Sequence, residues 1–241
     1  MVNGFDLAAI MEAMDSLDEI LSFIHSQNPP PQLIAVSKTK SQEQIREAFE
    51  KGIRSFGENR VQEFLTKREL LSDLPIHWHF IGGLQSNKVR SLAGKVDLFH
   101  GLDSRKLFRK LTREGTKISM GTPSLIQVNI SRESQKGGVL PEELEGFCRD
   151  LLQEENEFCP IRGLMCIGSS LESVGESRVQ EEFKEMQRLF QGLDSLKSTH
   201  FRMEFLSMGM SSDFRLALKY GSNMIRVGRA IFGARDIEGY V

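Results

Sequence analysis

Eight short apolar segments, rich in β-branched residues, alternate along the chain with charged stretches of helical period. This alternation predicts parallel strands joined by helices. Eight is also the number of strands that closes a (β/α)₈ TIM barrel, and the 241-residue length is near that of one such domain. The expected strands are residues 33–38, 55–58, 78–82, 98–102, 125–130, 163–167, 205–208 and 224–228.

An open doubly wound sheet is the alternative α/β fold, but no G-x-G-x-x-G motif follows the first expected strand. Apolar residues at three- and four-residue steps predict a helix before the barrel, and Pro29, Pro30 and Pro31 end it. No linker-like tract divides the chain. We therefore expect a single barrel domain over residues 1–241, with an N-terminal helix within 1–28 and the barrel over 33–235.

The charge balance argues against two classes of partner. Lys and Arg number 31 against 33 Asp and Glu, so no field of one sign favours nucleic acid or an anionic membrane. The three cysteines form no C-x-x-C pair, which is typical of a reducing compartment. There is no basic, apolar leader and no run near the roughly 20 apolar residues that span a bilayer. We expect a cytoplasmic protein.

Lys38 is the first candidate for chemistry, in the segment AVSKTK at 35–40. Ser41 and Gln44 predict a capping box, so the strand is expected to stop around Thr39, with Lys38 as its last lysine and Lys40 in the loop. A lysine at the mouth of a barrel is partly desolvated, which lowers the amine pKa and exposes a nucleophile. The alternative is a lysine that extends to solvent at a strand end.

The segment after the last strand, MIRVGRAIFG at 224–233, is a candidate anion site. Gly228 leaves room for the backbone to approach a ligand, and Arg229 is expected to begin a short helix whose N–H groups face an anion. Barrels often hold a phosphate after strands seven and eight. Ser211 or Ser212 is expected to cap the helix after strand seven, and its hydroxyl could also bind a phosphate. Capping alone, and an ordinary strand exit, are the alternatives.

Two further segments place polar side chains at strand ends. Asn59 follows the second strand, where its amide could meet a ring substituent of a ligand. His77 and His79 share one face of the third strand, and His79 lies nearer the mouth. No third ligand stands at useful spacing, so we expect no metal site. Trp78 is expected to pack in the core.

Several short motifs occur in a consistent order between about residues 33 and 235. They are AVSKTK (35–40), FGEN (56–59), VQE (61–63), WHFIG (78–82), LQSNK (84–88), IRGLM (161–165), LSMGMS (206–211), IRVG (225–228) and IFG (231–233). Together they resemble the pyridoxal 5′-phosphate (PLP) homeostasis protein family, also called the PLP-binding protein family. The resemblance implies a fold like the barrel domain of alanine racemase, without the second domain of the racemase.

The resemblance also implies PLP as the cofactor, held as a Schiff base on Lys38. Arg226 would face the pyridine nitrogen, and Ser211, Gly228 and the backbone N–H of Arg229 would hold the phosphate. The family often has a small polar residue where this chain has Arg229, so that contact is expected through backbone only. Asn59, His79 and Met208 complete the cofactor-binding residues that we expect.

Members of this family are regarded as carriers or regulators in intracellular PLP homeostasis, with no settled catalytic activity. An arginine beside the pyridine nitrogen leaves that nitrogen unprotonated, which weakens the ring as an electron sink. The two tyrosines, Tyr220 and Tyr240, do not stand at expected strand ends. We therefore expect no enzyme activity, and PLP and transient contacts with apo PLP enzymes as partners. A PLP-dependent amino-acid racemase and a cofactor-free Schiff-base aldolase are the alternatives.

Overall fold

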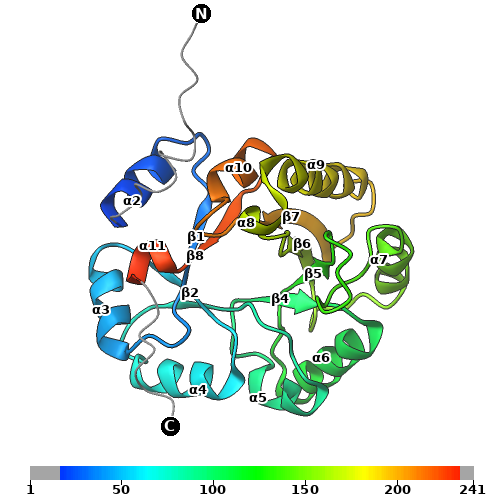
Figure 1. The fold of residues 1–241 in the computed structure, drawn as a ribbon. Coiled ribbons are helices and arrows are strands. Elements are labelled where there is room, and N and C mark those ends of the chain that lie inside the picture. Colours follow the sequence, from blue (N-terminus) through cyan, green and yellow to red (C-terminus); the bar gives the residue numbers. More distant parts are fainter. Residues whose placement is uncertain (1–16, 234–241) are drawn as a thin grey trace, which may run out of the picture.

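The computed structural model describes residues 17–233, in which eight parallel strands close into a barrel ringed by helices (Figure 1). Each strand pairs with the next in sequence, and the last pairs with the first. The predicted (β/α)₈ barrel is therefore confirmed. The strands are β1 (Gln32–Val36), β2 (Ser55–Glu58), β3 (His77–Phe80), β4 (Leu98–Leu102), β5 (Ser124–Val128), β6 (Ile161–Cys166), β7 (Phe201–Ser207) and β8 (Met224–Val227).

Helices follow every strand, and the β3–β4 and β6–β7 connections each contain more than one helical segment. They are α2 (Leu17–His25), α3 (Gln42–Glu50), α4 (Val61–Leu70), the 3₁₀ helix η1 (Ser86–Lys88), α5 (Val89–Leu92), α6 (Arg105–Ile118), α7 (Leu144–Gln153), α8 (Leu171–Val174), α9 (Glu176–Gly192), α10 (Phe214–Lys219) and α11 (Arg229–Phe232). No helix within residues 17–233 is long and apolar enough to cross a membrane.

The strand bounds agree with the sequence prediction for β2 and β4 and differ by a few residues elsewhere. The difference that matters most is at β1, which ends at Val36 rather than Lys38. The carbonyl of Ser37 accepts the N–H of Lys40 in a turn, and Thr39 has a left-handed backbone with φ 65°. The chain has therefore left the sheet before Lys38, and the prediction of an in-strand lysine is wrong.

Local sequence signals predict one helix start correctly and another wrongly. The capping box at Ser41 is present, because its hydroxyl accepts the N–H of Gln44 and the Gln44 side chain accepts the N–H of Ser41. Apolar residues at steps of three and four over 183–193 predict a helical stripe, and Phe183 and Met186 are buried on α9. The sequence also predicts that Pro141 opens a helix, because proline is tolerated at the first helical position, and this prediction is wrong. Pro141 begins a turn, and α7 starts at Leu144.

The N-terminal helix covers one side of the barrel. Ile20 and Ile24 of α2 are buried in a cluster with Phe214 of α10 and with Ile225 and Val227 of β8. The predicted helix is thus confirmed from Leu17 to His25, while its earlier apolar positions, Leu7, Ile10, Met11 and Met14, lie outside the described residues.

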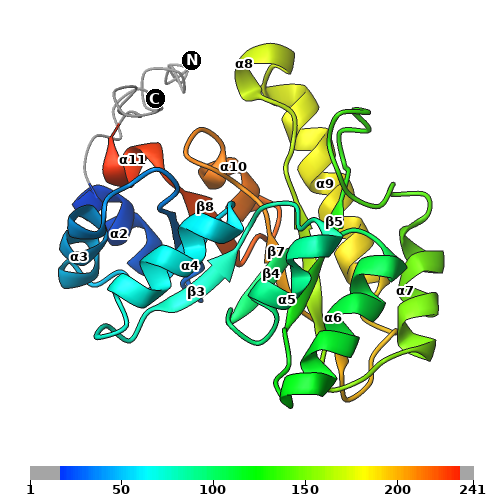
Figure 2. The same ribbon diagram turned by 90° about the horizontal axis from the view of Figure 1, so that it is seen from below.

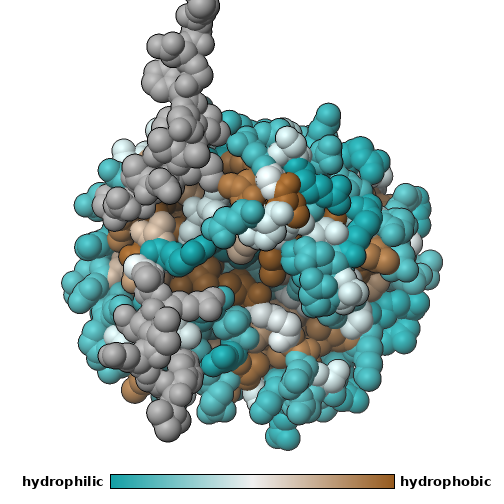
Figure 3. All heavy atoms as spheres, viewed as in Figure 1, coloured by the Kyte–Doolittle hydropathy of each residue, from teal (hydrophilic) through white to brown (hydrophobic). Residues whose placement is uncertain are grey.

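The carboxyl ends of the strands meet at the end of the barrel where α8 and α11 lie (Figure 2). In the view of Figure 1, hydrophilic residues dominate the periphery of this face, and hydrophobic residues appear toward its middle (Figure 3). Residues that follow different strands are gathered here by barrel closure, so this end is where a ligand site is expected.

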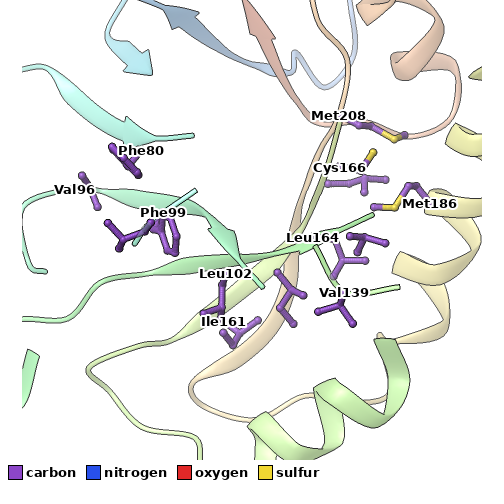
Figure 4. Packing of buried hydrophobic residues seen from close by; sticks show 14 of the residues in the cluster. Phe80, Val96, Phe99, Leu102, Val139, Ile161, Leu164, Cys166, Met186 and Met208 are labelled. Atoms are coloured by element: carbon purple, nitrogen blue, oxygen red, sulfur yellow. The ribbon is translucent and has the colours of Figure 1, made fainter. Parts of the chain in front are cut away.

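The core has two layers, one inside the barrel and one between the barrel and the helices. Ile34, Leu98 and Met165 belong to a compact inner cluster. The outer layer is larger and includes Phe80, Phe99, Leu164 and Met186, part of which is seen in Figure 4. Trp78 lies in this outer layer and packs edge-on against Phe64 of α4, with 5.9 Å between ring centroids, as predicted for a packing residue.

Candidate functional site

Lys38 is half-buried in the turn that follows β1. The N–H of Ser37 still donates to the carbonyl of Gly57 on β2, which makes Ser37 the last point of attachment to the sheet. Lys40 is buried, and its ammonium donates to the carbonyl of Phe232 on α11 at 3.2 Å. The lysine-bearing turn is therefore anchored on one side to β2 and on the other side to the segment after β8.

Barrel closure brings the expected phosphate loop beside this turn. A Cβ placed on Gly228 would lie 3.3 Å from the Cβ of Val36, so the end of β8 passes very close to the end of β1. Arg229 begins α11 as expected, with Gly228 as the preceding cap residue. The Arg229 side chain is exposed, in keeping with a backbone contact only.

The loop after β7 is tied to the same point. The N–H of Gly228 donates to the hydroxyl of Ser211 at 3.3 Å. The cap residue of α10 is Asp213, whose carboxylate accepts the N–H of Met210 at 2.5 Å rather than one inside the helix. The prediction that Ser211 or Ser212 caps this helix is therefore wrong. The hydroxyl of Ser211 instead joins the seventh and eighth loops.

A chain of polar side chains runs through the barrel interior below the mouth. The guanidinium of Arg226 donates to the Ser207 hydroxyl at 2.7 Å and to the carbonyl of Cys166 at 2.8 Å. Ser207 lies 3.3 Å from Nδ1 of His100, and Nε2 of His100 lies 3.0 Å from Nδ1 of His79. All four of these side chains are buried. A single connected network therefore links β8, β7, β4 and β3.

Burial controls the charge of this network. Desolvation lowers the pKa of His79 to about 4 and, together with the nearby His79 and Arg226, lowers the pKa of His100 well below its ordinary value. Burial also lowers the pKa of Arg226. Both histidines are thus neutral at physiological pH, and Arg226 is the cation of this interior network.

Neutral histidines allow one continuous direction of donation. Because Ser207 accepts from Arg226, its own hydroxyl proton can go to Nδ1 of His100. His100 then donates from Nε2 to Nδ1 of His79, which leaves the proton of His79 on Nε2. That Nε2 atom is buried without a hydrogen-bond partner. An unpaired donor of this kind is costly unless a ligand or water meets it.

The remaining predicted site residues fall in different environments. Asn59 follows β2 directly and is half-buried, and a Cβ on Gly82 would collide with its backbone. The side chain of Met208 is fully buried in the outer core near Cys166 and Met186, so it could reach a ligand at the mouth only through its backbone (Figure 4).

His77 is exposed on β3, with Nδ1 3.5 Å from the carboxylate of Asp97, and takes no part in the interior network. Across residues 17–233, no three His, Cys, Asp or Glu side chains gather into a group that could hold a metal ion.

The sequence prediction missed one group beside the site. Glu58, Glu63 and Lys67 lie under the turn that carries Lys38, with the Lys67 ammonium 2.8 Å and 2.7 Å from the two carboxylates. The motifs FGEN and VQE contain both acids, and Glu63 and Lys67 stand one helical turn apart. That spacing is visible in the sequence, whereas the contact of the group with the first loop is not.

The matches to known proteins follow the whole barrel. The model of the alanine racemase N-terminal domain family matches residues 10–236. A pyridoxal phosphate homeostasis protein of Aquifex aeolicus is 40% identical over 203 residues, which are 84% of this chain and 86% of that protein. One of Schizosaccharomyces pombe is 39% identical over 208 residues, 86% of this chain and 85% of that protein.

Solved structures are also similar to this chain over the whole barrel. PipY of Synechococcus elongatus PCC7942, with PLP bound, is 36% identical and superposes with a TM-score of 0.78, covering 90% of this chain and 99% of PipY. Alanine racemase of Clostridium difficile superposes with a TM-score of 0.73 at 13% identity, a likeness of fold alone. This chain covers 62% of that racemase.

Because His79 and His100 are buried in the neutral form, we expect the free energy of unfolding to fall as the solution becomes acidic. An unfolded histidine takes up a proton near pH 6.5, whereas His79 in the fold does so only near pH 4. Between these two pKa values the unfolded state binds more protons than the folded state. The contribution of His79 to the free energy of unfolding is therefore complete above about pH 7 and is lost as the pH falls. Between pH 7.5 and 5.0, His79 should account for about 2 kcal/mol of lost unfolding free energy.

Urea unfolding at the two pH values checks this. His79→Gln should shrink the wild-type difference by that amount, while His77→Gln, at an exposed position two residues away, should leave it unchanged. An equal difference in wild type and His79→Gln would show that the pair is not held neutral.

Proposed function

Because the chain belongs to the family of pyridoxal phosphate homeostasis proteins, we propose that it binds PLP as a Schiff base on Lys38. In this proposal it acts in intracellular PLP homeostasis as a carrier or regulator. The observation that carries the proposal is the convergence of the Lys38 turn, the backbone at the start of α11 and the buried Arg226 guanidinium toward one end of the barrel. PipY, 36% identical to this chain, has been solved with PLP bound.

Lys38 supplies the amine. Its turn is half-buried and adjoins the segment after β8, so a bound aldehyde at the mouth would meet it. The amine nitrogen adds to the aldehyde carbon, a C=N bond replaces C=O, and water leaves. Bound PLP supplies an electron-withdrawing ring next to that bond.

The loops after β7 and β8 fit a phosphate. Ser211 already accepts the N–H of Gly228, so its own hydroxyl proton is available to a phosphate oxygen. The first N–H groups of a helix have no partner within the helix, and α11 begins at Arg229. A Cβ on Gly228 would lie 3.3 Å from the Cβ of Val36, a tight contact, so a larger side chain there would push the two segments apart.

Arg226 fits the place opposite the pyridine nitrogen. Its guanidinium is held in the interior by Ser207 and by the carbonyl of Cys166. A cation there keeps the ring nitrogen unprotonated. In the proposal, Asn59 and His79 line the ring, and the unpaired Nε2 of His79 is a donor that a ligand could satisfy. Met208 contributes through its backbone.

The carrier role extends to partners and location. We propose transient contacts with apo PLP enzymes that receive the cofactor, in the cytoplasm. The family name concerns homeostasis, and a weakly activating site suits the transfer of PLP better than catalysis on it. A PLP-dependent amino-acid racemase is the competing function.

Lys38→Ala should abolish the Schiff-base absorbance that appears when PLP is added to the wild-type protein, because in the proposal the Lys38 amine bonds to the aldehyde. Borohydride reduction followed by peptide mapping should place the label on Lys38. Lys88→Ala, at an exposed position, is the control and should label like wild type. Full labelling of Lys40 or Lys88 in the wild type, with none on Lys38, would refute the assignment.

Ser211→Ala should weaken PLP retention by roughly tenfold or more, the effect of losing one hydrogen bond to a charged group. Gly228→Val should weaken it further, because its side chain blocks the backbone approach and meets Val36. Ser212→Ala is the matched control and should bind as wild type. Equilibrium dialysis measures retention, and if Ser211→Ala and Gly228→Val both keep wild-type affinity, the phosphate lies elsewhere.

The PLP-loaded protein should not racemise or transaminate free amino acids at a sustained rate. Arg226 leaves the ring a poor electron sink, and a buried His79 with a pKa of about 4 is a weak base at neutral pH. Tyr220 follows α10 rather than a strand, and Tyr240 lies outside the described residues. The check is incubation with L- and D-amino acids, then chiral and keto-acid analysis. Sustained turnover lost in Lys38→Ala would favour the racemase.

A further inference from the structure

A buried ion cluster lies directly under the proposed Schiff-base lysine. It consists of Glu58 at the end of β2 and of Glu63 and Lys67 on α4. Glu58 is fully buried and Lys67 is 7% exposed. The Lys67 ammonium lies between the two carboxylates, at 2.8 Å from Glu58 and 2.7 Å from Glu63. We define these three residues as the α4 charge cluster.

The cluster binds both residues that flank the lysine. The hydroxyl of Ser37 donates to Glu58 at 2.6 Å, and the Lys67 ammonium donates to the carbonyl of Ser37 at 2.7 Å. On the other side, the N–H of Thr39 donates to the carboxylate of Glu63 at 2.5 Å. Two of these charge-assisted hydrogen bonds fix the peptide groups on either side of Lys38, and the third holds the side chain of Ser37.

The backbone at Thr39 explains why such fixing is needed. Its φ of 65° is in the left-handed region, which a β-branched residue rarely adopts. A strained conformation of this kind persists only where its surroundings determine it. Glu63 holds the Thr39 N–H, and the Lys40 N–H closes the turn on Ser37.

Stability alone does not account for this arrangement. Taking several charges out of water is costly, and apolar residues of similar volume often stabilise a core as well or better. Burial raises the pKa of Glu58, against the effect of Lys67, which shows that the site bears this desolvation cost. The side chains of the cluster, beyond their bonds to one another, hydrogen-bond to Ser37 and Thr39 in the turn that carries the lysine.

We infer that Glu63 and Lys67, with Glu58, are positioning residues that hold the Lys38 turn in the conformation that captures PLP. This inference rests on the proposed function, because it assigns the cluster a purpose at the same site. Glu63→Ala removes the acceptor of the Thr39 N–H from a residue that is only partly buried. Glu63→Gln keeps an oxygen acceptor at the same place.

The first test reads the turn without any ligand. In the PLP-free protein, hydrogen exchange at the Thr39 amide should be about tenfold faster in Glu63→Ala than in wild type. It should return to within a few-fold of wild type in Glu63→Gln. Glu145→Ala, which breaks an exposed ion pair with Arg149 at the same helical spacing on α7, is the matched control and should not change it.

The second test adds PLP and follows the Schiff-base absorbance by stopped flow. Capture should slow about tenfold in Glu63→Ala, recover in Glu63→Gln and stay unchanged in Glu145→Ala, at similar melting temperatures. The double variant Glu58→Gln/Lys67→Met, which removes one charge of each sign, should also slow capture.

The outcomes separate the two proposals. Exchange and capture that are the same in Glu63→Ala, the double variant and wild type would overturn this inference and leave the proposed function standing. If the wild-type protein forms no Schiff base while Thr39 exchange still responds to Glu63→Ala, the proposed function fails and the cluster has no role in capture.

Discussion

The pairing of β1 with β8 is the constraint on which the candidate site depends. It closes the barrel and places the turn after β1, with Lys38, against the segment after β8, with Gly228 and α11. Local sequence brings neither near the other, since they stand close to opposite ends of the described chain. The bond from Lys40 to Phe232 and the approach of Gly228 to Val36 are consequences of that closure. Without it, Lys38 and the backbone proposed to hold the phosphate would belong to separate surfaces.

Two supports hold this junction from different sides. From inside, the hydrogen-bonded network from Arg226 through Ser207 and His100 to His79 fixes a buried guanidinium beside neutral histidines. From outside, the α4 charge cluster fixes the peptide groups next to Lys38. In the proposed site, the first support would set the charge that faces a bound ring, and the second would set the position of the Lys38 amine. A site of this kind is prepared before its ligand arrives, which lowers the cost of binding.

Much of the fold could be predicted because its signals are local. The eight apolar segments gave the barrel, Ser41 and Gln44 gave a helix start, and the period of α9 gave its buried face. The end of β1 was wrong by two residues because the turn is stabilised by Glu63 and Lys67, which are distant in sequence. The cap of α10 was wrong because Ser211 bonds to Gly228 rather than to its own helix. That Met208 contacts the cofactor stays a prediction, and the burial of its side chain in the outer core is not visible in the sequence.

A crystal structure of the PLP-loaded protein tests the central claim most directly, because it locates the amine, the ring and the phosphate together. We expect continuous density from the Lys38 nitrogen to the cofactor, the phosphate on Ser211 and the backbone of Gly228 and Arg229, and the Arg226 guanidinium at the ring nitrogen. Thr39 should keep its left-handed backbone, bound to Glu63. PLP joined to another lysine, or a phosphate bound away from the loops after β7 and β8, would contradict the account.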